Sequence, residues 1–209
     1  QPYALTAQGK ADVHDEVDSF AGLLDEHALE VAQRVDSSNM LRAWQTAMIY
    51  VEKLYQHEMP SRLIDSYDAL AERGMGAVAN MTIQQIEKVI VEDPRYEEPP
   101  QNWKSDSHYC LPFQGAESLM QAGERVAAHL QQQMQKLHAE AGVDTVKLFV
   151  GHGAAFRHAA FHLGILQFEQ LAQFSMFHAR PVLIEYIDDG NWRHIGGDWK
   201  LRNAANGLD

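Results

Sequence analysis

The sequence predicts an α/β fold, specifically a three-layer α/β/α sandwich with a mostly parallel central sheet. Segments with the helical spacing of apolar residues alternate along the chain with short β-prone runs. The run 145–150 is largely apolar, which is typical of a strand that is covered on both faces. The chain has 209 residues, of which 45% are hydrophobic, and this is enough to bury a core. We therefore expect one domain over residues 1–209, with an insertion loop at about 93–113.

Acidic residues outnumber basic ones, because 29 Asp and Glu stand against 17 Lys and Arg and give a formal net charge of −12. A surface of this charge repels nucleic acid and anionic membranes. No apolar run approaches the roughly 20 residues that cross a bilayer, and the single cysteine, Cys110, cannot form an internal disulfide. We expect a cytoplasmic protein without nucleic-acid or membrane partners, in which any anion site is local.

Four segments place apolar residues at intervals of three and four, which predicts helices with one face on a core: 5–29, 40–55, 82–91 and 116–139. The second segment follows a polar stretch whose side chains accept hydrogen bonds from free helix amides, and Ser38 is the expected N-cap. Thr82 is the expected cap of the third.

Short β-prone runs occupy residues 62–65, 145–150 and 181–187, and the last returns through a turn into 192–195 as a hairpin. Between Asp93 and Pro112 the chain carries four prolines and few aliphatic residues, which predicts an irregular loop. Such a loop either covers a pocket and selects the substrate or is simply solvated.

The strongest chemical signal is a strand that ends in Gly151-His152-Gly153 and leads into a helix. In an α/β sheet, ligands bind beyond the carboxyl ends of the strands, where a helix N-terminus directs free N–H groups at them. This position would place His152 at an anion site, and the two glycines would let substrate approach the backbone closely. A histidine is more often structural, and the chain has 11, but the position at a strand end distinguishes His152.

Arg42 falls near the first turn of the helix predicted at 40–55. A cation there opposes the helix dipole unless a bound anion or a carboxylate compensates it. Phosphate is a natural partner, because a guanidinium binds its oxygens through two hydrogen bonds. The alternative is an arginine that lies along the flank of its helix.

Glu72 lies in the turn 70–76, which is bounded by glycine. A carboxyl group held in such a turn can act as a general acid or base. Taken alone, Glu72 is equally well explained as a solvated loop charge.

Together these segments resemble the histidine phosphatase superfamily, whose members are similar to phosphoglycerate mutase. Arg42 matches the phosphate-binding arginine of a Ser-x-Leu-x-Arg-Ala-x-x-Thr-Ala motif, in which Met40 replaces the usual leucine. Glu72 matches the proton donor of a Leu-x-Glu turn, and His152 matches the second catalytic histidine at the end of a strand. The resemblance spans nearly the whole chain in the correct order.

Two further segments carry the resemblance. Residues 113–118 and the helix with Arg125 are similar to the family's Gly-Glu-Ser segment and the helix after it, with one residue inserted between Gly and Glu. Residues 5–11 are similar to the Leu-Thr-x-x-Gly segment that follows the family's first motif.

The family's Arg-His-Gly motif, which carries the phosphorylated histidine, is expected before Leu5, and the sequence does not contain it. The pair Arg193-His194 lies in the predicted hairpin and no glycine follows it, so we do not assign it to the motif. Two interpretations remain. The motif lies upstream of Gln1, which the absence of an initial methionine favours, or the chain is an inactive family member that keeps an anion pocket.

The resemblance implies a phosphoryl-transfer enzyme, either a phosphatase or a mutase, that forms a phosphohistidine without a metal or another cofactor. Its catalytic residues would be His152, Glu72 and Arg42, and its phosphate-binding residues Arg42, Ser38, His152 and Gly153. Its substrate would be a small phosphorylated molecule or a phosphoprotein. The alternatives are an inactive phosphate-binding or regulatory module, and an α/β domain that acts only through partner contacts. The sequence leaves the oligomeric state open, a homodimer included.

Two more histidines have a spacing that occurs in zinc sites. His158 and His162 lie four residues apart on the helix predicted after Gly153. The glutamate of the protease motif is missing, and the residues between them are suited to packing in a core. We therefore expect no metal site there.

Overall fold

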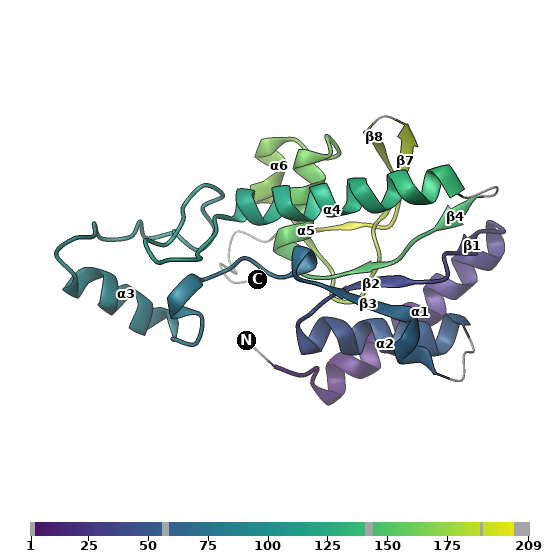
Figure 1. Cartoon of the computed structure of the whole chain (residues 1–209), viewed down its shortest axis with the longest axis horizontal. Coiled ribbons are helices and arrows are strands. Elements are labelled where there is room, and N and C mark those ends of the chain that lie inside the picture. The colour runs from purple at the N-terminus through teal and green to yellow at the C-terminus, as the bar shows by residue number, and fades with distance from the viewer. Residues whose placement is uncertain (1–2, 56–58, 141–143, 189, 203–209) are drawn as a thin grey trace.

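Three parallel strands form the centre of the molecule (Figure 1). The computed structural model describes residues 3–55, 59–140, 144–188 and 190–202. The middle strand, β2, is fully buried and pairs with β3 along one edge and with β5 along the other. A second parallel pair is formed by β1, which precedes β2 in the chain, and β4, which precedes β5. The bounds of these strands are β1 Glu30–Val31, β2 Val35–Ser38, β3 Ile64–Tyr67, β4 Thr145–Val146 and β5 Phe149–Val150.

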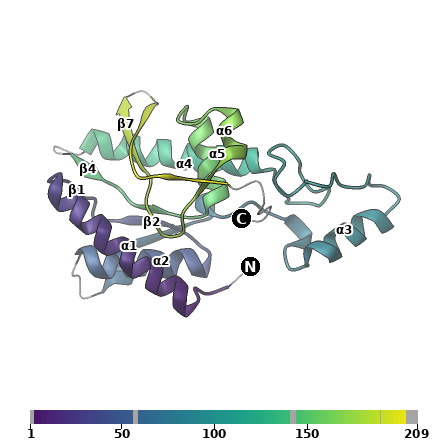
Figure 2. The same ribbon diagram turned by 180° about the vertical axis from the view of Figure 1, so that it is seen from behind.

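Helices cover both faces of these strands, and the views from the front and from behind agree on this arrangement (Figures 1 and 2). One layer contains α1 and α2, and the opposite layer contains α4 and α5 with the short α6 beside them. The predicted α/β sandwich with a parallel central sheet is therefore confirmed. The helix bounds are α1 Ala7–Glu26, α2 Leu41–Tyr55, α3 Ile83–Glu92, α4 Leu119–Glu140, α5 Gly153–His162 and α6 Phe168–Gln173.

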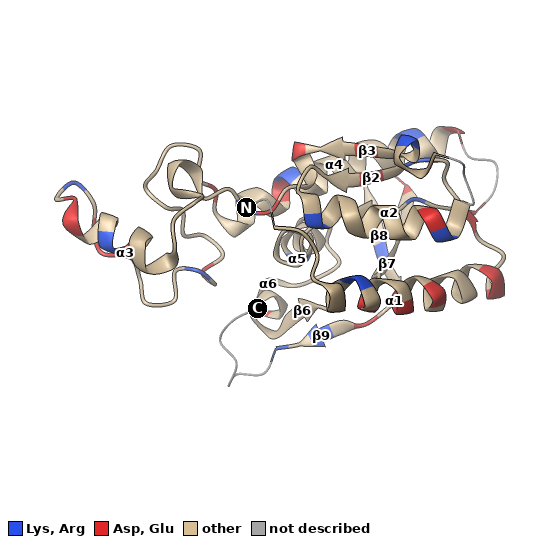
Figure 3. Ribbon diagram, turned by 90° about the horizontal axis from the view of Figure 1, so that it is seen from below, with Lys and Arg blue, Asp and Glu red and all other residues tan. Residues whose placement is uncertain are grey.

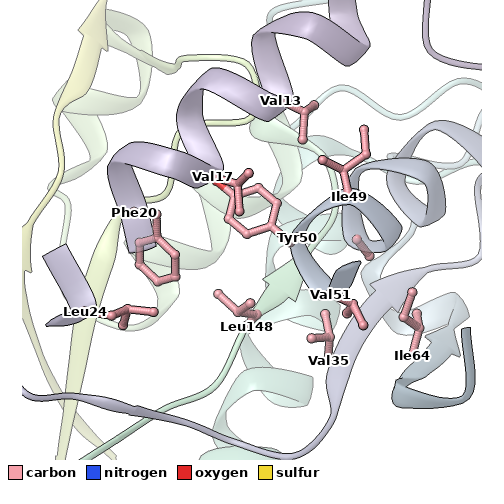
Figure 4. Close-up of a cluster of buried hydrophobic side chains, with 11 residues drawn as sticks. Val13, Val17, Phe20, Leu24, Val35, Ile49, Tyr50, Val51, Ile64 and Leu148 are labelled. Carbon is pink, nitrogen blue, oxygen red and sulfur yellow. The ribbon is translucent and has the colours of Figure 1, made fainter. Parts of the chain in front are cut away.

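The core between α1, α2 and the sheet follows from the apolar spacing of α1 (Figure 4). This helix begins at an N-cap, because the Thr6 hydroxyl accepts a hydrogen bond of 3.0 Å from the amide of Gly9. Spacings of four, three and four residues then place one stripe of side chains on α2 and on the sheet. Its buried members are Val13, Val17, Phe20 and Leu24. The opposite face of α1 is acidic, as Figure 3 shows.

On the other face of the sheet, α4 and α5 pack closely because their contact is made of small residues. Ala122 and Val126 of α4 lie in one cluster with Ala155 and Ala159 of α5. A Cβ at Gly123 would lie only 2.4 Å from the Cβ of His158, so this position tolerates no side chain without moving the helices. The close packing fixes α5, and with it the residue that precedes α5.

The segment 74–118 forms a lobe that projects from the sandwich and contains α3 (Figure 1). Residues 93–118 form no helix or strand there, but they fold back on α3 around a core of their own. Trp103 is 1% exposed in this core, and its indole N–H donates a hydrogen bond of 2.9 Å to the Glu87 carboxylate. The solvated loop that we considered is therefore wrong for Trp103, because this segment has its own hydrophobic core.

Two antiparallel pairs complete the fold, and the predicted C-terminal hairpin is one of them. These strands are β6 Phe174–Met176 with β9 Trp199–Leu201, and β7 Leu183–Asp188 with β8 Asn191–Gly196. Among the described residues, no helix is both long and apolar enough to cross a lipid bilayer.

Several elements differ from the sequence prediction. The central strand β2 includes the polar residues that were expected only to cap the second helix, and the strand predicted at 62–65 is β3, Ile64–Tyr67. The second helix, predicted over 40–55, begins at Leu41. The expected N-cap, Ser38, is instead the last residue of β2, and Met40 directly precedes the helix. The strand predicted at 145–150 is interrupted at Lys147, whose ammonium group turns inward to the buried carboxylate of Asp36 at 2.7 Å.

A substitution of Trp103 tests whether the lobe has an independent core. Trp103→Ala removes a fully buried indole, which typically costs about 3–5 kcal/mol. We expect the amides of residues 75–116 to lose protection in hydrogen exchange while those of β2 and β5 keep theirs. An equal loss of protection in β2 would contradict a separate core.

Candidate active site

The carboxyl ends of the central strands bring the predicted site residues together. Ser38 is the last residue of β2, and His152 follows β5 after one glycine and is the N-cap of α5. Arg42 is the second residue of α2, which starts just beyond β2. Glu72 follows the 3₁₀ helix Asp68–Leu70, which comes directly after β3. All five residues predicted for the site thus lie just at or beyond the ends of three adjacent parallel strands, with Gly153 as the first residue of α5 after His152.

Their side chains form a connected network. The His152 Nε2 atom lies 3.0 Å from the Ser38 Oγ atom, and its Nδ1 atom lies 3.1 Å from Nη2 of Arg42. The same Arg42 nitrogen donates a hydrogen bond to Oε2 of Glu72, and this oxygen lies 4.0 Å from Nδ1 of His152. A guanidinium, an imidazole and a carboxylate therefore share one space.

The network also defines the tautomer of His152. A guanidinium has only donors, so Nδ1 of the ring must accept the hydrogen bond from Arg42. The ring proton is then on Nε2 and is donated to the hydroxyl oxygen of Ser38. That oxygen also accepts the amide of Met40 at 3.2 Å, which ties the start of α2 to the histidine.

The ionisation of His152 agrees with this tautomer. The side chain is 7% exposed, and burial, together with the positive charge of Arg42, lowers its pKa from 6.5 to about 3. The imidazole is therefore neutral near pH 7. The positive charge in the centre of the network then comes from Arg42, opposite the carboxylate of Glu72.

The structure supplies a partner for the cation at the start of α2. We considered a bound anion or a carboxylate as compensation for Arg42, and Glu72 is that carboxylate. Arg42 thus points across the sheet ends to Glu72 and His152 instead of lying along the flank of its own helix.

The two glycines beside His152 differ in their roles. A Cβ at Gly151 would lie 2.9 Å from the Phe156 ring and 3.0 Å from the carbonyl oxygen of Leu70, so packing alone requires glycine. A Cβ at Gly153 would lie 3.5 Å from Met176, which is an ordinary contact. Gly153 is the first residue of α5, and its place at the site is that of the helix N-terminus beside His152.

The sequence analysis did not predict a buried polar cluster around Asp36, two residues before Ser38 on β2. The Asp36 carboxylate, 1% exposed, lies 2.8 Å from Nε2 of His129 and 2.7 Å from Nζ of Lys147. The available signal was a lysine within an otherwise apolar strand run. This cluster connects α4 and the link between β4 and β5 to β2.

The other histidines that we weighed are engaged elsewhere. His158 donates from Nδ1 to the carbonyl oxygen of Ala154 at 2.8 Å, and its Nε2 atom lies 3.0 Å from Oγ of Ser107. His162 reaches the carbonyl oxygen of Met120 at 3.0 Å. His194 lies on β8 and is bonded to backbone carbonyls of the same hairpin.

The comparisons with known proteins identify the family and the fold. Residues 3–195 match the family model of the histidine phosphatase superfamily (branch 1), and the chain belongs to this superfamily. No protein in a search of curated proteins matches the chain.

Solved structures of the same fold include mycobacterial glucosyl-3-phosphoglycerate phosphatase in complex with inorganic phosphate. It is 18% identical, with a TM-score of 0.63, and the match covers 97% of this chain and 87% of that one. The alpha-ribazole phosphatase from Shigella flexneri is 15% identical, with a TM-score of 0.61 and coverage of 93% and 84%. At these identities the likeness concerns the fold.

The lowered pKa of His152 predicts a specific dependence of stability on pH. Between about pH 6.5 and pH 3 the unfolded chain binds a proton at this histidine and the folded chain does not. The free energy of unfolding therefore falls as the pH falls through this window, by up to about 1.4 kcal/mol per pH unit. In His152→Asn the dependence, measured by urea unfolding, should be shallower, whereas His162→Asn should leave it unchanged. Equal slopes in all three proteins would contradict the assignment.

Proposed function

We propose that this protein is a metal-independent phosphoryl-transfer enzyme, a phosphatase or phosphomutase, that acts through a phosphohistidine. The observation that carries the proposal is the meeting of Arg42, His152 and Glu72 at the carboxyl ends of three parallel strands. This is the place where ligands bind to an α/β sheet. Catalysis of phosphoryl transfer depends mainly on positioning and electrostatic stabilisation, which such a cluster supplies.

Each group has a distinct role in this proposal. Arg42 donates hydrogen bonds to the phosphoryl oxygens, and the N-terminus of α5 at Gly153 directs its dipole at the same anion. Ser38 holds the ring of His152 through Nε2. A phosphate dianion near the ring favours the protonated imidazole, so His152 takes up a proton on binding and donates from Nδ1.

Glu72 manages the protons of both steps. In the first step a histidine nitrogen attacks phosphorus, the bond to the leaving oxygen breaks, and the Glu72 carboxyl group protonates that oxygen. In the second step water or an acceptor hydroxyl attacks the phosphohistidine, and the Glu72 carboxylate accepts its proton. The dephosphorylated alcohol leaves after the first step. After the second step the histidine is free again, and inorganic phosphate or the phosphorylated acceptor leaves.

The nucleophilic histidine of this proposal belongs to an Arg-His-Gly strand upstream of Gln1. The support is the edge of β5, which pairs with β2 on one side. Among the described residues no strand pairs with its other side. A parallel strand there would end beside His152, because the carboxyl ends of parallel strands lie at the same edge of a sheet. Residues 1–209 with the lobe as an insertion would then form one domain.

The substrate in this proposal is a small phosphomonoester or a phosphorylated protein side chain. Two proteins of the same fold bear the names of phosphatases for small phosphorylated molecules. An inactive phosphate-binding module is the alternative, because the cluster of Arg42 and His152 by itself suffices to bind an anion and the sequence holds no Arg-His-Gly motif.

Substitution of His152 tests the anion site. His152→Ala removes a donor and leaves Arg42 without its neighbour, so binding of phosphate or vanadate should fall below detection in calorimetry. The melting temperature should remain close to that of the unaltered protein. His162→Ala, on the exposed face of the same helix, is the matched control and should bind normally. Unchanged binding by His152→Ala would refute the proposed role.

Substitution of Glu72 tests the proton donor. Glu72→Gln keeps the shape of the side chain and loses the proton, so kcat with an aryl phosphate should fall by about 10²–10⁴ while KM changes little. Glu124→Gln, at an exposed position of α4, is the control. Equal losses in kcat and in substrate affinity would argue against proton transfer. No turnover by the full-length natural protein would leave the binding module as the function.

A further inference from the structure

We propose that Arg125 is a positioning residue for Glu72, which it orients through the backbone of the turn that carries this carboxylate. This inference rests on the proposed function and extends it to a residue of α4 that lies outside the cluster of Ser38, Arg42, Glu72 and His152. The evidence is the set of hydrogen bonds that the Arg125 guanidinium makes.

The guanidinium of Arg125 binds the turn from the side that precedes Glu72. Its Nη1 atom donates to three carbonyl oxygens, those of Asp68 at 3.2 Å, Ala69 at 2.9 Å and Ala71 at 3.2 Å. Ala71 is the direct neighbour of Glu72 in the chain. The last carbonyl groups before the carboxylate are therefore bound to one side chain of α4.

The other edge of the guanidinium binds Glu117, and Glu117 holds the turn on the side that follows Glu72. Nε and Nη2 of Arg125 donate to the two carboxylate oxygens at 2.9 and 2.7 Å. The amide of Gly74 donates to Glu117 at 2.9 Å, and the amide of Glu117 donates to the carbonyl oxygen of Gly74, also at 2.9 Å. Burial acts to raise the pKa of Glu117, but the hydrogen bonds from Arg125 and Gly74 outweigh this and lower it, so the carboxylate stays ionised.

The turn is also restricted by the lack of space around Gly74. A Cβ at Gly74 would lie 3.0 Å from the carbonyl oxygen of Gly115 and 3.3 Å from Oε2 of Glu117. The turn is thus fixed at both ends, between Arg125 before Glu72 and Glu117 after it.

Glu72 needs this support because its own side chain has little packing. It is 50% exposed and follows a short 3₁₀ helix, where no long helix or strand fixes the backbone. Proton transfer requires a carboxyl group within hydrogen-bond reach of the leaving oxygen, and a displacement of about 1 Å can cost a hundredfold in rate. Lysine cannot replace Arg125, because its compact ammonium group cannot donate at the same time to both oxygens of the Glu117 carboxylate and to three carbonyl oxygens on the other side.

A double-mutant cycle of Arg125→Lys and Glu72→Gln separates positioning from a merely structural role. Arg125→Lys should lower kcat for an aryl phosphate by about tenfold or more at nearly constant KM. In the Glu72→Gln background the same change should alter kcat less than twofold. Independent effects of the two changes would overturn the inference, because a residue that acts through Glu72 has no effect once Glu72 has lost its function.

A second measurement does not depend on turnover. The side-chain ¹⁵Nη2 resonance of Arg42, recorded without ligand, reports its contact with Glu72, because Nη2 makes that contact. Arg125→Lys should move this resonance toward its position in Glu72→Gln and should not move it further in the Glu72→Gln background. Glu117→Gln weakens the same link between Arg125 and the turn, so it should move the resonance in the same direction. It replaces Arg125→Lys in the experiment if that variant unfolds too easily. An unmoved resonance would overturn the inference even where catalysis fails.

The matched control is Arg180, which forms a similar two-pronged pair with Glu16 of α1, with distances of 2.8–3.1 Å. Arg180→Lys should lower stability comparably and leave both kcat and the Arg42 resonance unchanged. All kcat values are measured on the full-length natural protein. No turnover by that protein without substitutions, with the expected shift of the resonance, would overturn the proposed function and support the positioning role. Equal effects of Arg180→Lys and Arg125→Lys on kcat would reduce Arg125 to a structural residue.

Discussion

The contact of the Arg42 guanidinium with the imidazole of His152 and the carboxylate of Glu72 is the constraint on which the site depends. It joins three stretches of chain that are 30 to 110 residues apart in sequence. Because Arg42 stands in the first turn of a helix, its charge opposes the helix dipole and needs a negative partner. Glu72 is that partner.

The sheet makes this contact possible by ending three parallel strands at one edge. Close packing of α4 on α5 then fixes His152, since the absence of a side chain at Gly123 lets the two helices touch at His158. Burial keeps the imidazole neutral, and its hydrogen bonds to Ser38 and Arg42 use both ring nitrogens. The strands position the histidine and the arginine, whereas the carboxylate depends on a turn held by a distant side chain.

That turn joins the site to the projecting lobe. Residues 74–118 leave the sandwich directly after Glu72 and return to it at Glu117, so both ends of the lobe pass Arg125. The lobe has its own hydrophobic core around Trp103. Arg73, whose pKa is lowered by burial, lies over the Trp103 ring at 5.9 Å and connects this core to the residue beside Glu72.

The sequence by itself predicted the fold class, every described α-helix except the short α6, and the candidates His152, Arg42 and Glu72, because periodic apolar spacing, caps and strand-end motifs are local signals. It did not predict the central strand β2, whose polar residues carry no β-prone pattern. Only the tertiary structure decided which partners these groups have. Arg42 was predicted to need an anion or a carboxylate, but nothing local identifies Glu72 as that carboxylate. The hydrogen bonds of Arg125 to carbonyl groups more than 50 residues away, and the buried cluster of Asp36 with His129 and Lys147, leave no periodic trace in sequence. Such contacts arise only when the sheet brings distant segments together, since each side chain alone is compatible with many partners.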